Sequence, residues 1–198
     1  MTGSRILTRE FYERPTVEVA RDLLGKVLVH GRTAGRIVEV EAYLGGDDRA
    51  AHSSRGLTPR TSVLFGPPGH AYVYFIYGMH ECFNVVAERN GKPGGILVRA
   101  VEPLCGVPLM KRRRPKARTL VDLTSGPGKL TQALGITRRN NGCNLTAGSL
   151  TIRELSQFGE TEIGVSPRIG IRHCADWPLR FFVPGNAFVS ATPKPREK

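Results

Sequence analysis

The chain has 198 residues, 40% of them hydrophobic, and its 29 lysine and arginine residues against 17 acidic residues give a formal net charge of +12. This length suits one domain with a core of its own, and no apolar run approaches the roughly 20 residues of a membrane-spanning helix. The excess of positive charge predicts a polyanionic partner, nucleic acid before an anionic membrane surface.

The first part of the chain predicts one helix and a β-hairpin. Residues 1–14 have no clear period and are expected to form an irregular arm. Apolar residues then recur at helical spacing in 15–25, where Gly25 ends the helix. Strands over 26–30 and 36–44, separated by a Gly-rich turn, complete the hairpin.

The middle of the chain predicts a long loop and three further strands. Residues 45–70 are rich in Gly, Pro and Ser, and a connection of this length is usually functional or disordered. Strands are expected over 71–77, 80–88 and 96–103, with an Asn90-Gly91 turn between the last two.

The last third predicts helices and short strands. A helix is expected at the start of 106–118 and another over 125–135, where Pro127 suits the first turn. Later strands are expected over 149–155, 168–171 and 179–184, and residues 191–198 form a loose tail. With no repeat and no linker, residues 1–198 are predicted to form one α+β domain built on hairpins.

Two carboxylates lie one pleat apart on the second strand of the first hairpin. Strand side chains alternate, so Val38 and Val40 are expected on the core face, with Ile37, Glu39 and Glu41 on the other. A solvent-exposed acidic pair is one interpretation. The surroundings are basic, however, and a carboxylate beside a phosphate-binding surface repels the phosphates. A protein that only binds DNA gains nothing from such a carboxylate, so the other interpretation is a chemical role for Glu41.

The strand over 71–77 is rich in tyrosine. Tyr72, Tyr74 and Ile76 share one face, and Tyr77 comes at the turn with Gly78. Ordinary packing of aromatic residues in a sheet is one interpretation. The other is a stacking platform for nucleic-acid bases, with a side chain at the hairpin tip that wedges into the base stack.

Two basic segments are candidate phosphate contacts. Residues 111–118 hold six cationic side chains, which are either a solvated loop or a salt-dependent contact to a nucleic-acid backbone. The sequence SGPGKL places Gly126, Gly128 and Lys129 at a helix N-terminus, where free N–H groups favour an anion. The spacing is not that of a Walker phosphate-binding loop.

The cysteines and histidines predict no metal site. Cys82, Cys105, Cys143 and Cys174 form no C-x-x-C pair and are expected to be separate thiols that are buried or inert. A zinc nucleobase deaminase needs H-x-E and P-C-x-x-C, and neither motif occurs. We expect no metal and no other cofactor.

Several motifs together resemble those of the alkyladenine (3-methyladenine) DNA glycosylase family. They are GRIVEVEAYLG, AAHSSRGLTPR, YVYFIYGMHECFN, ILVRAVEP, SGPGKL, RIGI and PLRFFV, in order over about residues 15–190. The resemblance implies a repair enzyme that flips a damaged purine out of duplex DNA and hydrolyses its N-glycosidic bond, leaving an abasic site. It also implies a mixed domain around a curved, mainly antiparallel sheet with flanking helices and a protruding hairpin.

The resemblance also implies roles for individual residues. Glu41 matches the catalytic carboxylate that deprotonates the attacking water. The residues that match the pocket around the flipped base are Tyr43, His52, Tyr74, Asn84 and Arg99. Tyr43 and His52 would sandwich the base against Tyr74, and Asn84 would disfavour the amino group of an unmodified guanine. Tyr77 would fill the gap in the duplex, and contacts to the DNA backbone are expected from Arg60, Met79, Gly126 and Lys129.

Glu39 has no chemical role in these motifs and is expected to be an ion-pair partner, while the role of His80 stays open. The pocket motifs contain no lysine, so we expect no lyase activity.

The expected partner is double-stranded DNA with 3-methyladenine, 7-methylguanine, hypoxanthine or ethenoadenine. We expect a monomer with no membrane and no obligate protein partner. Residues 1–15 lack the apolar stretch of a signal peptide, so we expect a cytoplasmic protein bound to the nucleoid, or a nuclear one in a eukaryote. The alternative is an inactive damage-binding module of the same fold.

Overall fold

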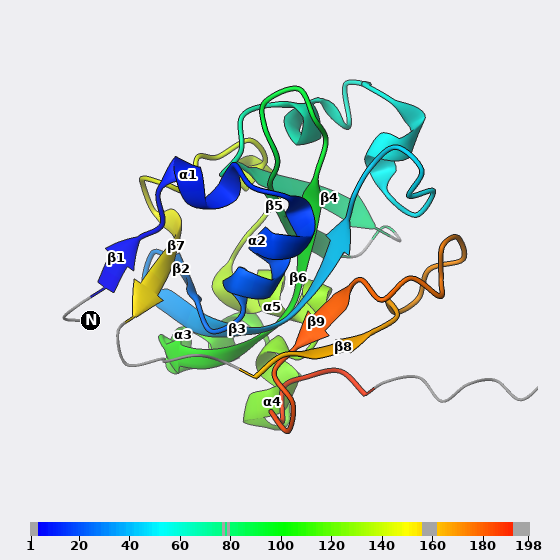
Figure 1. The fold of residues 1–198 in the computed structure, drawn as a ribbon. Helices are drawn as coiled ribbons and strands as arrows, with labels where there is room; N and C mark the ends of the chain where they lie inside the picture. Colours follow the sequence, from blue (N-terminus) through cyan, green and yellow to red (C-terminus); the bar gives the residue numbers. More distant parts are fainter. Residues whose placement is uncertain (1–3, 77, 79, 156–161, 192–198) are drawn as a thin grey trace, which may run out of the picture.

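A curved β-sheet forms the centre of the molecule (Figure 1). The computed structural model describes residues 4–76, 78, 80–155 and 162–191. The strands are β1 (Ser4–Ile6), β2 (Val27–His30), β3 (Thr33–Tyr43), β4 (Ala71–Ile76), β5 (His80–Val86), β6 (Gly95–Cys105), β7 (Leu150–Leu155), β8 (Gly164–Ser166) and β9 (Arg180–Phe182). Seven run in the order β1-β7-β2-β3-β6-β5-β4, while β9 pairs with β3 and β8. The pairings between these strands are antiparallel, which confirms the predicted α+β fold.

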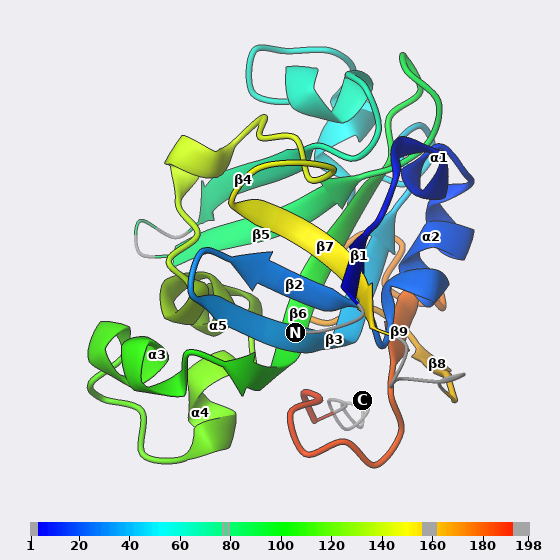
Figure 2. The same cartoon turned by 90° about the vertical axis from the view of Figure 1, so that its left-hand side faces the viewer.

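The helices lie in two groups on opposite sides of the molecule (Figure 2). One group is α1 (Arg9–Tyr12) and α2 (Thr16–Leu23), and the other is α3 (Val107–Arg113), α4 (Leu120–Thr124) and α5 (Pro127–Leu134). Three 3₁₀ turns, η1 (His52–Arg55), η2 (Ser62–Phe65) and η3 (Arg138–Asn140), lie in the loops. Pro127 begins α5 and Gly135, with a φ of 73°, ends it, so this helix has the predicted bounds to within two residues.

Two of the expected segments have a different secondary structure. Within the expected irregular arm, β1 pairs with β7, and Tyr12 of α1 is fully buried. Elements of three and four residues carry too little periodicity to be recognised in the sequence, and a distant pairing stabilises them. Residues 168–171, expected as a strand, form a loop whose polar groups bind side chains of other segments. Tyr77, Met79 and residues 192–198 lie outside the described residues.

The alternation of β3 is interrupted in its middle. The register against β6 shifts between Ile37 and Glu39, as at a β-bulge, so the side chains exchange faces there. Ile37 therefore joins the main core with Val40, whereas Val38 packs in a separate cluster with Phe188. The predicted faces of Ile37 and Val38 are wrong for this reason.

Four neighbouring strands, β3, β4, β5 and β6, have a second set of side chains on the face that points away from the main core. Core residues alternate with them along β3, β4, β5 and β6, as the period of a strand requires. The register aligns Glu41 with Leu97, Leu97 with Asn84, and Asn84 with Tyr72. This face, opposite the main core, forms the floor of a cavity.

Candidate active site

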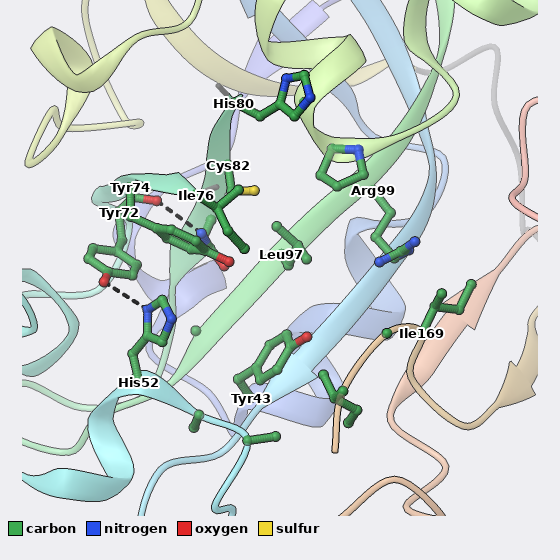
Figure 3. Close-up of a pocket in the computed structure, with 18 of the residues that line it drawn as sticks. Tyr43, His52, Tyr72, Tyr74, Ile76, His80, Cys82, Leu97, Arg99 and Ile169 are labelled. Carbon is green, nitrogen blue, oxygen red and sulfur yellow. Dashed lines mark hydrogen bonds between the residues drawn. The ribbon is translucent and has the colours of Figure 1, made fainter. Parts of the chain in front are cut away.

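A cavity of about 620 Å³ lies over this face of the sheet (Figure 3). Its floor comes from alternate residues of β4, β5 and β6, and Tyr43 at the end of β3 contributes from one side. Residues 50–53, residues 169–171 and the N-terminus of α5 supply the remaining walls. Segments far apart in the sequence therefore meet around a space large enough for one small ligand.

Glu41 lies behind the wall of this cavity and is fully buried. The Tyr43 hydroxyl donates to its Oε2 at 2.8 Å, and the Ile169 backbone N–H donates to its Oε1 at 2.7 Å. Arg99 Nη1 lies 3.2 Å from the same Oε1. All three donors line the cavity, so the carboxylate is held at its edge. The interpretation of a solvent-exposed acidic pair is wrong, because the 168–171 loop covers the strand end.

Glu39 is held in a buried ionic cluster beside Glu41. Its Oε1 accepts from Arg99 Nε at 2.9 Å and from Arg180 Nε at 2.7 Å, and its Oε2 accepts from the Ser190 N–H at 2.8 Å. Burial acts to raise the pKa of Glu39, but the Ser190 N–H and the two guanidinium groups outweigh it and lower that pKa. The prediction of an ion-pair partner is confirmed. Arg99 also joins Glu39 to Glu41, which the sequence did not indicate.

Aromatic side chains form one wall of the cavity. The His52 and Tyr74 ring centroids are 4.5 Å apart, and His52 Nδ1 lies 3.0 Å from the Tyr72 hydroxyl. Tyr43 faces this group across the cavity (Figure 3). The structure thus brings together Tyr43, His52 and Tyr74, the three residues expected to sandwich a flipped base. Tyr72, which the sequence placed on the same strand face as Tyr74, lines the cavity with them. The role of all four in binding a base stays a prediction.

Burial controls the protonation of this wall. It raises the pKa of Tyr74, and it raises that of Tyr43 together with the nearby Glu41 charge, so both phenols keep their protons. The Tyr43 hydroxyl therefore acts as a donor to Glu41. Burial also lowers the pKa of His52, followed by the charges of Arg60 and Arg55. A neutral imidazole at neutral pH follows from this environment.

We expect the His52 ring to titrate below its ordinary value of 6.5. Because the unfolded chain takes up this proton first, the free energy of unfolding should fall as the pH drops below about 6.5. An NMR titration of the His52 ring, assigned with a His52→Asn variant, measures the midpoint. A midpoint at or above 6.5 would contradict this account of the wall.

Asn84 and Cys82 lie in the floor of the cavity. Asn84 Nδ2 donates to the Tyr72 carbonyl at 3.1 Å, which fixes the amide against β4. Cys82 is buried, and burial raises the pKa of its thiol, so it stays uncharged. Cys82 was missed as a lining residue, although it alternates with Asn84 on β5. All four cysteines are free, as predicted.

The N-terminus of α5 forms the wall nearest β5. Gly126 donates its N–H to the Arg99 carbonyl at 3.0 Å, and Lys129 extends to within 3.7 Å of Asp122. A Cβ on Gly128 would lie 2.9 Å from the His80 side chain, so only glycine permits this close approach. Gly126 and Lys129, which are predicted to contact the DNA backbone, line the same cavity as the tyrosines.

Neighbouring arginines of the basic segment 111–118 have different surroundings. Arg113 Nη1 donates to the Ala133 carbonyl at 2.9 Å and caps the end of α5, whereas Arg114 lines the cavity. The Arg60 guanidinium lies 5.7 Å from the Tyr74 ring centroid. Tyr77 and Met79, expected to contact DNA, lie outside the described residues.

Residues 4–76, 78, 80–155 and 162–191 contain neither a metal-binding cluster nor a membrane-spanning helix. None of those residues forms a group of three or more His, Cys, Asp or Glu side chains that could hold a metal ion. Across the same ranges, no helix combines the length and the apolar character needed to cross a bilayer.

Comparison with known proteins identifies relatives of this chain. A sequence model of methylpurine-DNA glycosylase matches residues 10–187. A protein of Methanoculleus marisnigri named "Putative 3-methyladenine DNA glycosylase" is 54% identical over 190 residues, which cover 93% of this chain and 98% of that protein. Proteins of the same name from Methanocella arvoryzae and Koribacter versatilis are 50% and 51% identical, over 88% and 93% of this chain and 89% and 92% of theirs. These matches confirm the resemblance in the motifs, and the chain belongs to the methylpurine-DNA glycosylase family of DNA repair.

Proposed function

We propose that this protein releases alkylated or deaminated purines from duplex DNA by hydrolysis of the N-glycosidic bond, with Glu41 activating the water. The observation that carries the proposal is the placement of Glu41. Its carboxylate is buried at the edge of an aromatic cavity, and its donors Tyr43, Arg99 and Ile169 all line that cavity. The relatives' names support the reaction class.

The shape of the site supports base flipping. A cavity of about 620 Å³ bounded by rings accommodates one base, and a base stacked inside a duplex cannot reach it. Extrusion costs a few kcal/mol of unstacking, and less for a damaged base. From its motif position, we propose that Tyr77 occupies the vacated space and offsets that cost.

The aromatic wall supports a preference for cationic purines. Alkylation at N3 or N7 gives the purine a positive charge, which stacks favourably on the electron-rich rings of Tyr43 and Tyr74. A neutral His52 avoids repulsion of that charge. We therefore place 3-methyladenine and 7-methylguanine first among the substrates. Hypoxanthine and ethenoadenine follow as neutral bases of suitable shape.

The donors around Glu41 support its chemical role. As the bond breaks, the sugar gains oxocarbenium character, which a carboxylate stabilises while it orients and deprotonates water. Glu41 Oε2 has only the Tyr43 hydroxyl as its partner among the hydrogen bonds described, so it retains capacity to accept from a water molecule. The damage-binding alternative gives this carboxylate no function.

We propose no lyase step. The groups bonded to Glu41 are a phenol, a guanidinium and an amide, and none of them can form a Schiff base. Lys129 also lines the cavity, but its ammonium group is half-exposed and lies near Asp122. Borohydride trapping on a lesion duplex tests this point, and a covalent adduct lost in Lys129→Ala would overturn it.

The test of the proposed function is base release under single-turnover conditions. Duplexes that each carry one defined lesion are incubated with excess protein, and the free base and the abasic strand are quantified. Release of 3-methyladenine or 7-methylguanine with an intact abasic strand supports the proposal. Tight binding to every lesion with no release from any duplex supports the inactive binding module instead.

We expect Lys129→Ala to weaken DNA binding without changing lesion preference. The half-exposed ammonium beside the α5 N-terminus is placed to meet one phosphate, which carries no base information. The negative slope of log K against log salt should become less steep by about 0.9, the value for one phosphate contact. Fluorescence anisotropy over a salt series measures the slope, with Lys26→Ala, on the β2 side of the sheet, as the control. An unchanged slope would remove Lys129 from the interface.

We also propose that the protein acts as a monomer, because one cavity accommodates one lesion. We propose that it works in the cytoplasm, because its relatives come from bacteria and archaea, whose chromosome lies in the cytoplasm.

A further inference from the structure

A second buried ion pair lies next to the cavity, between Arg168 and Asp48. Both side chains are fully buried. Arg168 Nη1 donates to Asp48 Oδ2 at 2.6 Å and Nη2 donates to Oδ1 at 2.8 Å, so the pair is bidentate. Neither residue was indicated as part of a site by the sequence, and neither belongs to the groups that contact Glu41 directly.

Asp48 organises the loop that forms one wall of the cavity. Besides Arg168, its carboxylate accepts the Leu44 N–H at 3.0 Å and the Ala50 N–H at 3.2 Å. Ala50 and the residues that follow it, including His52, line the cavity. The position of the imidazole wall therefore depends on where the Asp48 carboxylate is held.

Arg168 organises the opposite wall and the surroundings of Glu41. Its Nη1 also donates to the Ala42 carbonyl at 2.9 Å, and its guanidinium lies 4.6 Å from the Tyr43 ring centroid. The next residue, Ile169, donates its N–H to Glu41 at 2.7 Å. Figure 3 shows Ile169 and Tyr43 on neighbouring sides of the cavity. Arg168 thus touches or adjoins two of the three donors of the carboxylate.

We propose that Arg168 and Asp48 are positioning residues, which tie the two walls together and hold the Ile169 N–H and the Tyr43 ring in place around Glu41. The inference rests on the proposed function for its effect on rate. A buried ion pair by itself is weak evidence that the pair stabilises a fold. This pair, however, joins two loops that are not held by β-sheet hydrogen bonds. Small misplacements around a reacting centre cost about 100-fold in rate.

The test compares Arg168→Lys, Asp48→Asn and the double variant with a destabilised control. Lysine keeps the charge but loses the bidentate fork and the stacking on Tyr43. Ile152→Ala, in the buried part of β7, destabilises the fold away from the cavity. Urea unfolding curves, recorded at several temperatures, first establish an assay temperature at which all four variants are folded in the absence of urea. The readouts are the maximal single-turnover rate, the protein concentration for half-maximal rate, and the NMR hydrogen exchange of the Ile169 amide.

We expect each single variant to lower the maximal rate roughly 100-fold with no change in the half-maximal concentration. The double variant should lose no more than either single one, because both act through one contact. Exchange of the Ile169 amide should accelerate while that of β2 amides does not. A rate equal to that of Ile152→Ala, or an unchanged Ile169 exchange, would overturn the proposal. If the wild type releases no base, the proposed function fails, and the exchange measurement alone decides the positioning role.

Discussion

Replacement of Glu41 by glutamine is expected to lower the single-turnover rate of base release by about 10²–10⁴-fold, the usual contribution of a positioned general base. Glutamine has nearly the same shape, its amide oxygen can still accept from the Ile169 N–H, and its NH2 group can donate to the Tyr43 hydroxyl oxygen, so the fold should persist. It carries no negative charge, however, and can neither deprotonate water nor stabilise an oxocarbenium-like sugar. The measurement is base release from the best lesion duplex with protein in excess.

Two controls make this result interpretable. Affinity for the same duplex should be unchanged or higher, because the variant removes a negative charge near a polyanion. Glu102→Gln changes a half-exposed carboxylate of β6 that pairs with Arg36 and should release base at the wild-type rate. Equal release by wild type and Glu41→Gln would remove Glu41 from the mechanism and leave the aromatic cavity without its proposed catalyst.

Replacement of Glu39 by glutamine is expected to destabilise the protein by about 3–5 kcal/mol, the cost of breaking a buried ion pair on one side. Arg99 and Arg180 would keep their charges in the interior without the carboxylate that both now contact. The amide oxygen could still accept from Arg99 Nε, but it carries no full charge, and the NH2 group would face the Ser190 N–H, donor against donor. Chemical denaturation at pH 7 measures the loss.

The pH dependence of stability gives an independent check on Glu39. Its pKa is lower in the folded state than the ordinary value of 4.5, so its stabilisation is complete above that value and is lost as the pH falls through the lower folded value. Glu39→Gln should flatten this acid limb. Glu154→Gln, at a more exposed carboxylate paired with Lys26 and Arg5, should cost at most about 1 kcal/mol. Equal losses in the two variants would show that the buried cluster contributes no more than a surface pair.

The sequence predicted those elements whose signal is local. Apolar spacing identified α2, Pro127 and Gly135 bounded α5, and aromatic and branched residues marked β4. The alternation of a strand also placed Tyr72 and Tyr74 on one face, where both line the cavity. These features depend on neighbours within a few residues, so the chain alone contains the information.

The bulge in β3 could not be predicted, because it depends on the register against β6, a strand about 60 residues away. The same limit explains the loop at 168–171. Its sequence suits a strand, but Arg168 and Ile169 satisfy their polar groups on Asp48 and Glu41 rather than in a ladder. Tertiary contacts of this kind override a weak local preference.

The sequence by itself determined the family, the charge that suits DNA, and the identity of Glu41 as the candidate base, since long ordered motifs and composition need no coordinates. Only the tertiary structure decided how that carboxylate is held. It buried Glu41 instead of exposing it, joined it through Arg99 to Glu39, and set the Ile169 N–H and the Arg168–Asp48 pair around it. The physical reason is that a buried charge needs partners, and here all of those partners except Tyr43 come from segments more than 50 residues away along the chain.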